Sequence, residues 1–432
     1  TLTDNTITWP AAITWNGGTT PTLIGASDLY EGAGQVFNLV TADGGTTWYG
    51  YEEVNNSVKK SFKLFSWGAN NAGQLGQNNT NRMSSPVQVP GTTWHVLADS
   101  GASVLYNAAG IKSDGTLWSW GDQSEGGDDY GVLGLNDNVD RSSPTQVPGT
   151  NWADIQKGYK SMFATKTDGT LWAWGYNING SLGQNNRTTY SSPVQIGSDT
   201  TWAVGDGKLA AGQDLAGAIK TNGTLWVWGK GQEGGLGQNQ ASPSLRRSSP
   251  VQVPGTTWNT IGMNGKIQVL ATKTDGTLWG WGGDGGPMAQ NNGVSYSSPV
   301  QIPGTTWTSC GGGETVFATK SDGTLWAWGN MTDYGLLGQN EAGTGGSGNR
   351  SSPIQIPGTN WKQSARAYFT TEYQAGAIKT DGTMWLWGYN TQGNLGLNDQ
   401  VHRSSPTQVP GTKWSSVATA WNQGSVYATQ EV

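Results

Sequence analysis

The sequence predicts an all-β fold, a β-propeller of four-stranded antiparallel blades, on three observations. One nine-residue phrase recurs at intervals of about 53 residues. Nearly every copy holds an Asp-Gly or Asn-Gly turn signal between alternating segments, which is typical of a β-hairpin. Two further phrases, Ser-Ser-Pro and Pro-Gly-Thr, keep the same period. A four-stranded sheet of this size is too small to be stable alone, but sheets stacked around an axis bury one another.

The nine-residue phrase marks one hairpin of each blade. Its six full copies, of the type TDGTLWAWG, occupy residues 113–121, 167–175, 221–229, 274–282, 321–329 and 380–388, and a partial copy, FSWG, occupies 65–68. The last Trp residues of successive copies lie 47 to 59 residues apart. Each interval therefore has room for one blade of four short strands.

The unit at 152–196 illustrates the expected strands. They begin at Trp152 and continue through residues 162–165, 171–174 and 194–196. Between the second and third strands, Asp168 and Gly169 are expected to form a type I′ turn, because both residues tolerate positive φ. The paired Trp of each unit recur at the same place, so we expect them to pack between neighbouring sheets rather than to bind sugars.

Ring closure has two possible forms. Residues 60–432 hold seven repeats of about 53 residues, so that strands at 414–432 would join those at 62–90 in one blade. Residues 1–59 would then be a divergent N-terminal segment, either an extension or an extra blade. An eighth blade is the alternative, because ITWPAAITW at 7–15 resembles VQVPGTTW, and 112 residues separate Trp387 from Trp67 around the closure.

The stretch after each hairpin resembles a known repeat. GYNINGSLGQNN at 175–186 is similar to the repeat of the regulator of chromosome condensation family, and LGQN or LGLN recurs six times, whereas MAQN at 288–291 departs from it. The resemblance implies seven blades. The Trp-, Gly- and Asn-rich style looks like that of bacterial and phage-encoded members, which favours a phage receptor-binding or decoration role.

Composition argues against several classes of function. Only 12% of the residues are charged and the net charge is -6, so nucleic acid is not expected as a partner. With 2 His and 1 Cys, and without a Ser-His-Asp arrangement or phosphate loop, we expect no enzyme, no cofactor and no metal site. No apolar run approaches the roughly 20 residues of a membrane helix, so membrane insertion is not expected.

Variable loops are expected on one rim of the propeller. The first-second and third-fourth loops of an antiparallel blade emerge together, and their lengths vary, whereas the Asp-Gly and Pro-Gly-Thr turns are nearly constant. An acidic stretch at 122–130 is expected to be a solvated loop, with cation binding as the alternative. The candidate contact residues on this rim are Asp128, Asp129, Tyr130, Arg246, Arg247, Tyr334, Tyr368, Phe369 and Tyr373.

These observations predict a non-enzymatic binding or scaffold propeller. We expect it outside the cytoplasm or on a virus particle, where it would recognise a cell-surface protein or glycan, or other virion or surface subunits. The first alternative is a secreted enzyme inhibitor that caps its target with one propeller face, as some related bacterial proteins do. A guanine nucleotide exchange or chromatin-binding factor is the other, weaker alternative, because the acidic charge does not suit it.

Overall fold

The computed structural model describes the chain outside residues 1–12, 16–35, 42–47, 54–60, 101–105, 126–127, 241, 243–244, 264–267, 284–287, 291–293, 313–314, 330–333, 342–349, 372 and 421–423. The chain divides into two compact units, Thr1–Lys60 and Ser61–Val432. In the first unit, β2 (Val36–Thr41) and β3 (Trp48–Glu53) form an antiparallel pair, and β1 (Ile13–Trp15) runs parallel to β3. The assignment of residues 1–59 as an extension or an extra blade stays a prediction.

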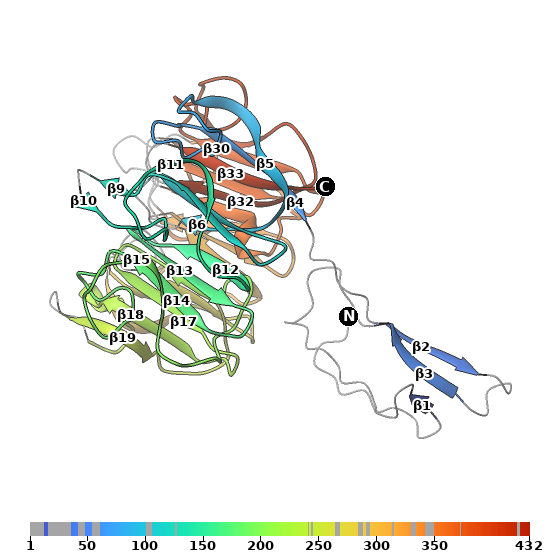
Figure 1. The fold of residues 1–432 in the computed structure, drawn as a ribbon, viewed down its shortest axis with the longest axis vertical. Coiled ribbons are helices and arrows are strands. Elements are labelled where there is room, and N and C mark those ends of the chain that lie inside the picture. The colour runs from blue at the N-terminus through green and yellow to red at the C-terminus, as the bar shows by residue number, and fades with distance from the viewer. Residues whose placement is uncertain are drawn as a thin grey trace. The chain divides into compact units, whose positions relative to one another are not determined.

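The second unit is all-β, with sheets of four antiparallel strands that we number as blades (Figure 1). Blade 1 joins β32 (Trp414–Ala420), β33 (Ser425–Glu431), β4 (Phe62–Gly68) and the first part of β5 (Met83–Leu97). Blade 2 joins the end of β5 to β7 (Asn107–Lys112), β8 (Leu117–Gly121) and β11 (Arg141–Gln146). Because β5 runs through both, the two blades share one seven-stranded sheet.

In the other five blades consecutive strands pair in chain order, and the sheet of blade 3 has β6 (Asp99–Ser100) as an additional parallel edge strand. Blade 3 consists of β12 (Trp152–Lys157), β13 (Ser161–Lys166), β14 (Leu171–Gly175) and β15 (Tyr190–Gln195). Blade 4 consists of β16 (Leu209–Ala211), β17 (Leu215–Ile219), β18 (Leu225–Lys230) and β19 (Arg246–Gln252). Blade 5 consists of β20 (Trp258–Met263), β21 (Val269–Lys273), β22 (Leu278–Gly282) and β23 (Tyr296–Ile302).

Blade 6 consists of β24 (Trp307–Gly312), β25 (Thr315–Lys320), β26 (Leu325–Gly329) and β27 (Arg350–Gln355). Blade 7 consists of β28 (Tyr368–Thr370), β29 (Gln374–Ile378), β30 (Met384–Gly388) and β31 (Arg403–Gln408). Short elements between the blade strands are β6 (Asp99–Ser100), β9 (Ser124–Glu125), β10 (Asp128–Asp129), η2 (Gln232–Gly234) and η3 (Ala365–Ala367).

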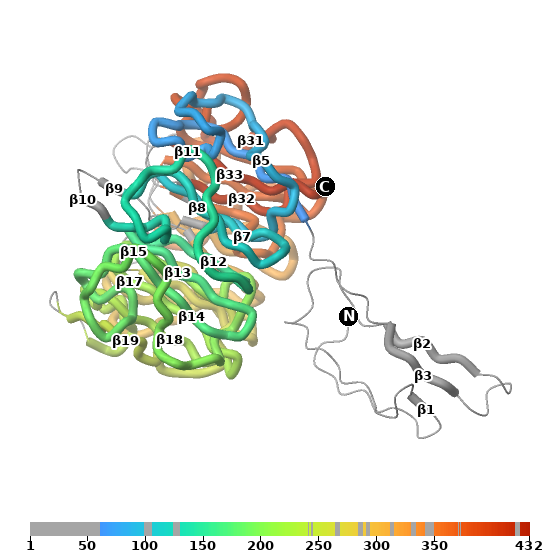
Figure 2. The backbone as a smooth tube through the Cα atoms, viewed as in Figure 1, coloured from blue at the N-terminus to red at the C-terminus, as the bar shows by residue number. Residues whose placement is uncertain are grey.

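The ring closes with strands from both ends of this unit. β33 pairs antiparallel with β4 in a register that matches Val426 to Trp67 and Glu431 to Phe62, as expected from the sequence. The first strands of neighbouring blades contact one another in turn, including β28 of blade 7 with β32 of blade 1. Figure 2 shows the blue N-terminal strand β5 of this unit beside its red C-terminal strands β32 and β33. The described strands of this unit therefore form a closed ring of seven blades.

The hairpin turns differ from the expected type I′ geometry. In the turn of blade 3, Gly169 has a positive φ of 76° and Asp168 does not, and the amide of Lys166 donates to the carbonyl of Thr170. This is a three-residue loop whose last residue is left-handed. The Asp168 carboxylate accepts from the Thr170 amide at 3.0 Å and from its hydroxyl at 2.7 Å. These two bonds explain why Thr follows each Asp-Gly.

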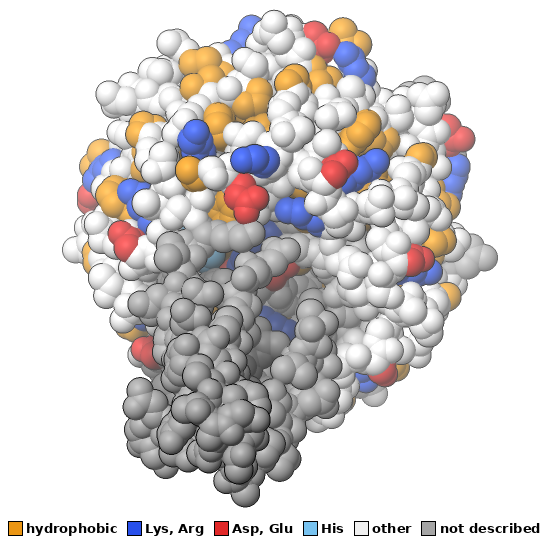
Figure 3. Space-filling view, turned by 90° about the vertical axis from the view of Figure 1, so that its right-hand side faces the viewer, with side chains coloured by type: hydrophobic (Ala, Val, Ile, Leu, Met, Phe, Trp, Pro, Cys, Tyr) orange, Lys and Arg blue, Asp and Glu red, His pale blue; other side chains and the backbone are white. Residues whose placement is uncertain are grey.

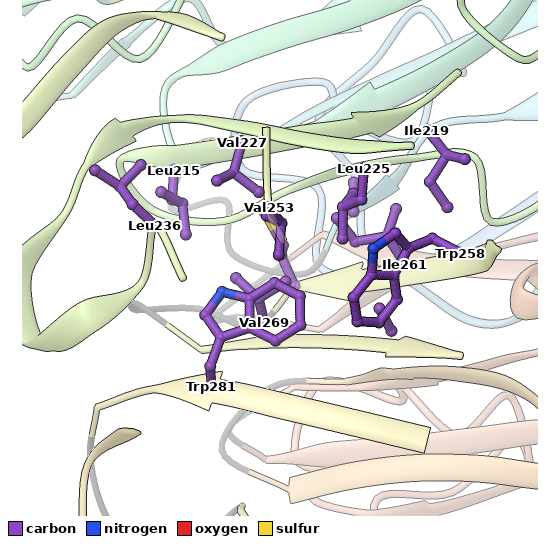
Figure 4. Close-up of a cluster of buried hydrophobic side chains, with 13 residues drawn as sticks. Leu215, Ile219, Leu225, Val227, Leu236, Val253, Trp258, Ile261, Val269 and Trp281 are labelled. Carbon is purple, nitrogen blue, oxygen red and sulfur yellow. The ribbon is translucent and has the colours of Figure 1, made fainter. Parts of the chain in front are cut away.

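The Trp residues have the packing role expected of them. In the close-up of one inter-blade core, Trp258 and Trp281 of blade 5 face Leu225, Val227 and Val253 of blade 4 (Figure 4). The second Trp of each WxWG phrase is fully buried, and such a ring removes roughly 200 Å² of mostly apolar surface from water. The repeated indoles thus supply the apolar burial that a single four-stranded sheet lacks.

Candidate binding face

The first-second and third-fourth loops of the blades share one end of the ring, which we call the loop face. The opposite end carries the Asp-Gly and Pro-Gly-Thr turns and is called the turn face. An antiparallel meander places the two kinds of connection at opposite ends of each sheet. Every third-fourth loop therefore lies next to the first-second loop of a neighbouring blade.

The third-fourth loops are held by buried amides. In blade 3, the Asn177 side chain accepts from the Leu182 amide at 2.9 Å and donates to the carbonyls of Asn186 and Thr188. The Trp228 indole of the next blade donates to the carbonyl of Ser181 at 2.8 Å. Asn70 and Asn390 repeat the amide bonds in blades 1 and 7. The loop face is thus a set of anchored loops, which explains the recurring Asn and Leu-Gly pair.

One tyrosine cluster, which we call the Lys160 cluster, lies between blades 2 and 3. The ammonium of Lys160 lies 4.4 Å from the ring centre of Tyr130, 5.3 Å from that of Tyr159 and 5.7 Å from that of Tyr176. It also donates to the Tyr130 hydroxyl at 2.9 Å. The rings of Tyr130 and Tyr176 meet edge to face, with centres 5.1 Å apart. The three rings therefore surround a cation supplied by the chain itself.

A second cluster, the Tyr334 cluster, lies between blades 6 and 7 and contains Tyr334, Tyr373, Tyr389 and His402. The rings of Tyr334 and Tyr389 meet edge to face with centres 5.0 Å apart, and His402 stacks on Tyr389 at 5.1 Å. Tyr373 lies 5.8 Å from Tyr334 and 5.9 Å from Tyr389. The Nδ1 atom of His402 accepts from the Asn390 amide at 2.9 Å, so in this arrangement the ring proton is on Nε2. The three tyrosines are half-buried and His402 is exposed.

The two arginines expected on the rim both start β19 and are half-buried. Arg246 donates through Nε to the side chain of Asn179 in the preceding blade at 2.9 Å. Arg247 donates to the carbonyl of Arg246 at 3.5 Å. Asp128 and Asp129 form β10, paired with β9, and their side chains lie outside the described part of the chain. The alternative of a cation in loop 122–130 therefore stays a prediction.

Three of the expected contact residues are buried. Tyr368 and Phe369 were expected in an exposed loop, but they form β28, the first strand of blade 7, with 2% and 4% of their surface exposed. The Tyr368 hydroxyl donates to Ser309 in blade 6. Tyr130 is 5% exposed. The first strand of blade 7 is interrupted, so sequence spacing alone places these two aromatic residues in a loop.

The interruption builds an ionic cluster on the propeller axis, which we call the axial cluster. Blades 4 and 7 keep only an isolated bridge at Trp202 and Trp361, and each chain then leaves the sheet before its first strand resumes. The two insertions meet, because the Ala365 amide donates to the carboxylate of Asp206 at 2.8 Å. Arg366 forms an ion pair with Asp154 of β12, and its Nε lies 4.0 Å from Asp206.

The axial cluster places one buried carboxyl, that of Asp154, near one arginine and a second carboxylate. Asp154 is 1% exposed, and burial raises the pKa of its carboxyl above the usual range, while Arg366 opposes this effect and Asp206 reinforces it. Blades 4 and 7 lie three positions apart around a seven-membered ring. The cluster therefore connects blades that are not neighbours in the ring.

Sequence reasoning did not find Lys160, Tyr176, Tyr389 and His402, nor the axial cluster. A signal for the tyrosine clusters exists, since DYG occurs at 129–131 and 333–335, and WGYN occurs at 174–177 and 387–390. Within the described ranges, no group of three or more His, Cys, Asp or Glu residues is placed to hold a metal ion. Across the same ranges, we find no helix with the length and apolar character needed to span a membrane.

Fold and loop geometry together define a seven-bladed propeller with anchored loops. Comparison with known families places the regulator of chromosome condensation (RCC1) repeat at residues 63–103, 168–206 and 381–425. These three stretches of the chain therefore match the repeat that its Gly-Tyr-Asn and Leu-Gly-Gln-Asn phrases resemble.

Several characterised proteins share this repeat. The chain is 28% identical over 352 residues to the human E3 ubiquitin-protein ligase HERC2. This match covers 79% of the chain but only 7% of HERC2. The chain is 23% identical over 354 residues to the ultraviolet-B receptor UVR8 of Arabidopsis thaliana, covering 79% of this chain and 76% of UVR8. Yeast RCC1 (Prp20), in its structure with Kap60, superposes with a TM-score of 0.70 at 18% identity, covering 86% of this chain and 90% of Prp20.

Proposed function

We propose that this chain is a non-enzymatic protein-binding propeller whose loop face is the contact surface. One observation carries the proposal. Of the five large apolar side chains that are exposed in the described part of the chain, four lie in third-fourth loops: Val139, Ile178, Val294 and Val401, each between 52% and 59% exposed. Anchored loops that present apolar side chains to water are typical of recognition surfaces.

Two further points support the proposal. The tyrosine clusters also lie on the loop face, and Tyr is among the residues enriched at binding hot spots. Yeast Prp20 binds Gsp1p and histones, and its structure has been determined with Kap60 bound to it. These partners belong to Prp20, and they support protein binding as the class of activity for this chain.

The surface charge supports a protein partner rather than nucleic acid. On the described surface seen in Figure 3, Lys and Arg side chains lie among Asp and Glu and apolar side chains rather than in one basic patch. Placement outside the cytoplasm or on a virus particle, with a cell-surface protein, a glycan or another virion subunit as partner, is a further proposal that rests only on the style of the repeat. The secreted inhibitor remains its alternative.

The test compares the two ends of the ring. A partner captured by the full chain is purified, and its Kd is measured with a loop-face variant carrying Val139→Arg, Ile178→Arg and Val401→Arg. The matched control carries Thr256→Arg and Thr305→Arg, because these exposed residues lie in Pro-Gly-Thr turns on the turn face. We expect the loop-face variant to bind at least roughly tenfold more weakly, with the control unchanged.

The opposite pattern would refute the proposal. If the turn-face control loses the partner while the loop-face variant keeps it, the contact surface lies at the other end. If the purified partner is an enzyme that the chain inhibits, or a small GTPase whose nucleotide it releases, the corresponding alternative is selected.

A further inference from the structure

The two tyrosine clusters occupy the same place in the repeat. Tyr130 and Tyr334 each precede a left-handed glycine, Gly131 or Gly335, in a third-fourth loop. The amide of Tyr176 donates to the carbonyl of Lys160 at 2.8 Å, and the amide of Tyr389 donates to the carbonyl of Tyr373 at 2.8 Å. Position 373 in blade 7 therefore corresponds to position 160 in blade 3.

The ring geometry is also the same in both clusters. The Tyr130 and Tyr176 rings have centres 5.1 Å apart and an interplanar angle of 76°, and the Tyr334 and Tyr389 rings have centres 5.0 Å apart at 71°. Since the first pair holds an ammonium, this ring arrangement is one that accommodates a cation on its electron-rich faces. The loops that carry the two pairs have the same anchors, because the Trp174 and Trp387 indoles donate to the carbonyls of Val132 and Leu336.

The clusters differ in charge and in accessibility. At position 373 the ammonium of the first cluster is replaced by a neutral phenol ring, and His402 adds a fourth ring. Tyr130 is 5% exposed, whereas each ring of the Tyr334 cluster is half-buried or exposed. The second cluster thus presents ring faces at the surface without a positive charge from position 373.

We propose that the Tyr334 cluster binds a cationic side chain, Lys or Arg, of the protein partner. This inference rests on the proposed function and names the chemistry of one part of the loop face. A protein cation suits the cluster better than a sugar, because a sugar stacks on one flat platform, whereas these rings stand at 47° to 82° to one another, apart from the His402 and Tyr389 stack. The overall negative charge of the chain also favours a basic partner.

A first experiment tests the cluster without any partner. The full chain, labelled with 3-fluorotyrosine, is titrated with n-butylammonium, the head and stem of a lysine side chain, and with neutral n-butanol, while ¹⁹F NMR follows the rings. We expect saturable shifts of Tyr334, Tyr373 and Tyr389, with n-butylammonium binding roughly 5- to 30-fold more tightly than n-butanol.

Two variants sharpen the result. Tyr373→Lys recreates the Lys160 cluster, so the new lysine ammonium should occupy the site and abolish the ¹⁹F shifts. If this variant does not fold, Tyr389→Leu is used instead, and it should abolish the shifts by removing a ring. Equal affinity for n-butanol, no shift of these rings, or full binding by both folded variants would overturn the proposal. Shifts with methyl β-galactoside but not with n-butylammonium would also overturn it, in favour of a glycan site.

A second experiment uses the purified partner. Tyr373→Lys should raise the Kd for the partner at least roughly fivefold. If Tyr373→Lys leaves the partner's Kd unchanged while the loop-face Arg variant abolishes binding, the cation site is wrong and the proposed function stands. If the loop-face Arg variant also leaves the Kd unchanged, the proposed function itself falls, whatever n-butylammonium does.

Discussion

Replacement of Arg366 by Met tests the axial cluster, because it removes the guanidinium that compensates a buried carboxylate. Asp154 is 1% exposed, and its ion pair with Arg366 bridges blades 3 and 7. Removing one partner of a buried pair costs about 3–5 kcal/mol when the other remains charged. Met keeps the length of the side-chain stem, so the loss is mainly electrostatic.

Protonation of Asp154 sets an upper limit on that cost. An ordinary aspartate has a pKa of 3.8, and keeping one protonated in the folded state at pH 7 costs about 1.4 kcal/mol for each pH unit above that value, or about 4 kcal/mol in all. Both estimates therefore indicate a loss of about 3–4 kcal/mol in the free energy of unfolding at pH 7.

The effect depends on pH with a definite sign. Because the folded-state pKa of Asp154 is raised, its protonation stabilises the fold below pH 3.8, and this contribution is lost as the pH rises through the folded-state value. Without Arg366 the pKa rises further, so the loss extends over a wider range. We expect the variant to approach the wild type near pH 4 and to diverge from it steadily toward pH 8.

Urea unfolding followed by Trp fluorescence at several pH values between 4 and 8 measures this difference. Arg403→Met is the matched control, since Arg403 pairs with Asp399 at the surface and its loss should cost under about 1 kcal/mol. The double variant Asp154→Asn, Arg366→Met should recover stability and lose the pH dependence. A loss for Arg366→Met that is the same at pH 4.5 and pH 7.5, or below about 1 kcal/mol at both, would refute the reasoning.

Three further predictions concern stability. Lys157 is buried and donates to the carbonyl of Asn107, and burial lowers the pKa of its ammonium from 10.5 to about 7. Lys157→Met should therefore stabilise the fold by about 1–3 kcal/mol at pH 6. Thermal melts should show this advantage shrinking between pH 7 and 10.5, because the folded wild type has already released its proton there. An unchanged difference in stability at pH 10 would contradict the expected direction of the pH dependence. Asp168→Ala should lower the free energy of unfolding by about 0.5–1.5 kcal/mol, because it removes the bond to the Thr170 amide. Asp168→Asn should be nearly neutral, because Asn222 makes the same bonds in blade 4. Equal losses of stability for both variants would show that the carboxylate charge matters. Trp174→Ala should lower the free energy of unfolding by about 3–5 kcal/mol, and Trp174→Phe should lower it less. A Phe variant as unstable as the Ala variant would mean that the hydrogen bond from the indole to Val132 contributes more than the packing of the ring.

Much of the fold follows from local patterns. Asp168-Gly169-Thr170 specifies its own turn through bonds between near neighbours in the chain, although the turn type differs from type I′. The expected antiparallel pairing of 414–432 with 62–90 also occurs, because the leftover strands at the two ends are complementary halves of one blade.

The candidate site was less predictable. Sequence placed Tyr334 and Tyr373 near the rim, but it did not place them in one cluster with Tyr389 and His402, which come from a different loop. Tyr368 is buried because the first strand of blade 7 resumes at that residue after its interruption. Burial of this kind depends on the neighbouring blade, whose Ser309 accepts the Tyr368 hydroxyl.

The sequence by itself determined the unit of this protein, a four-stranded sheet with Trp at fixed positions, because hairpin turns and strand alternation depend on residues close together in the chain. Only the tertiary structure decided which units meet across the axis. Asp154 and Arg366 lie 212 residues apart in the sequence, and they contact each other because the closed ring brings the first strand of blade 3 close to the insertion in blade 7. Such contacts depend on the curvature of the closed ring, which no single repeat encodes.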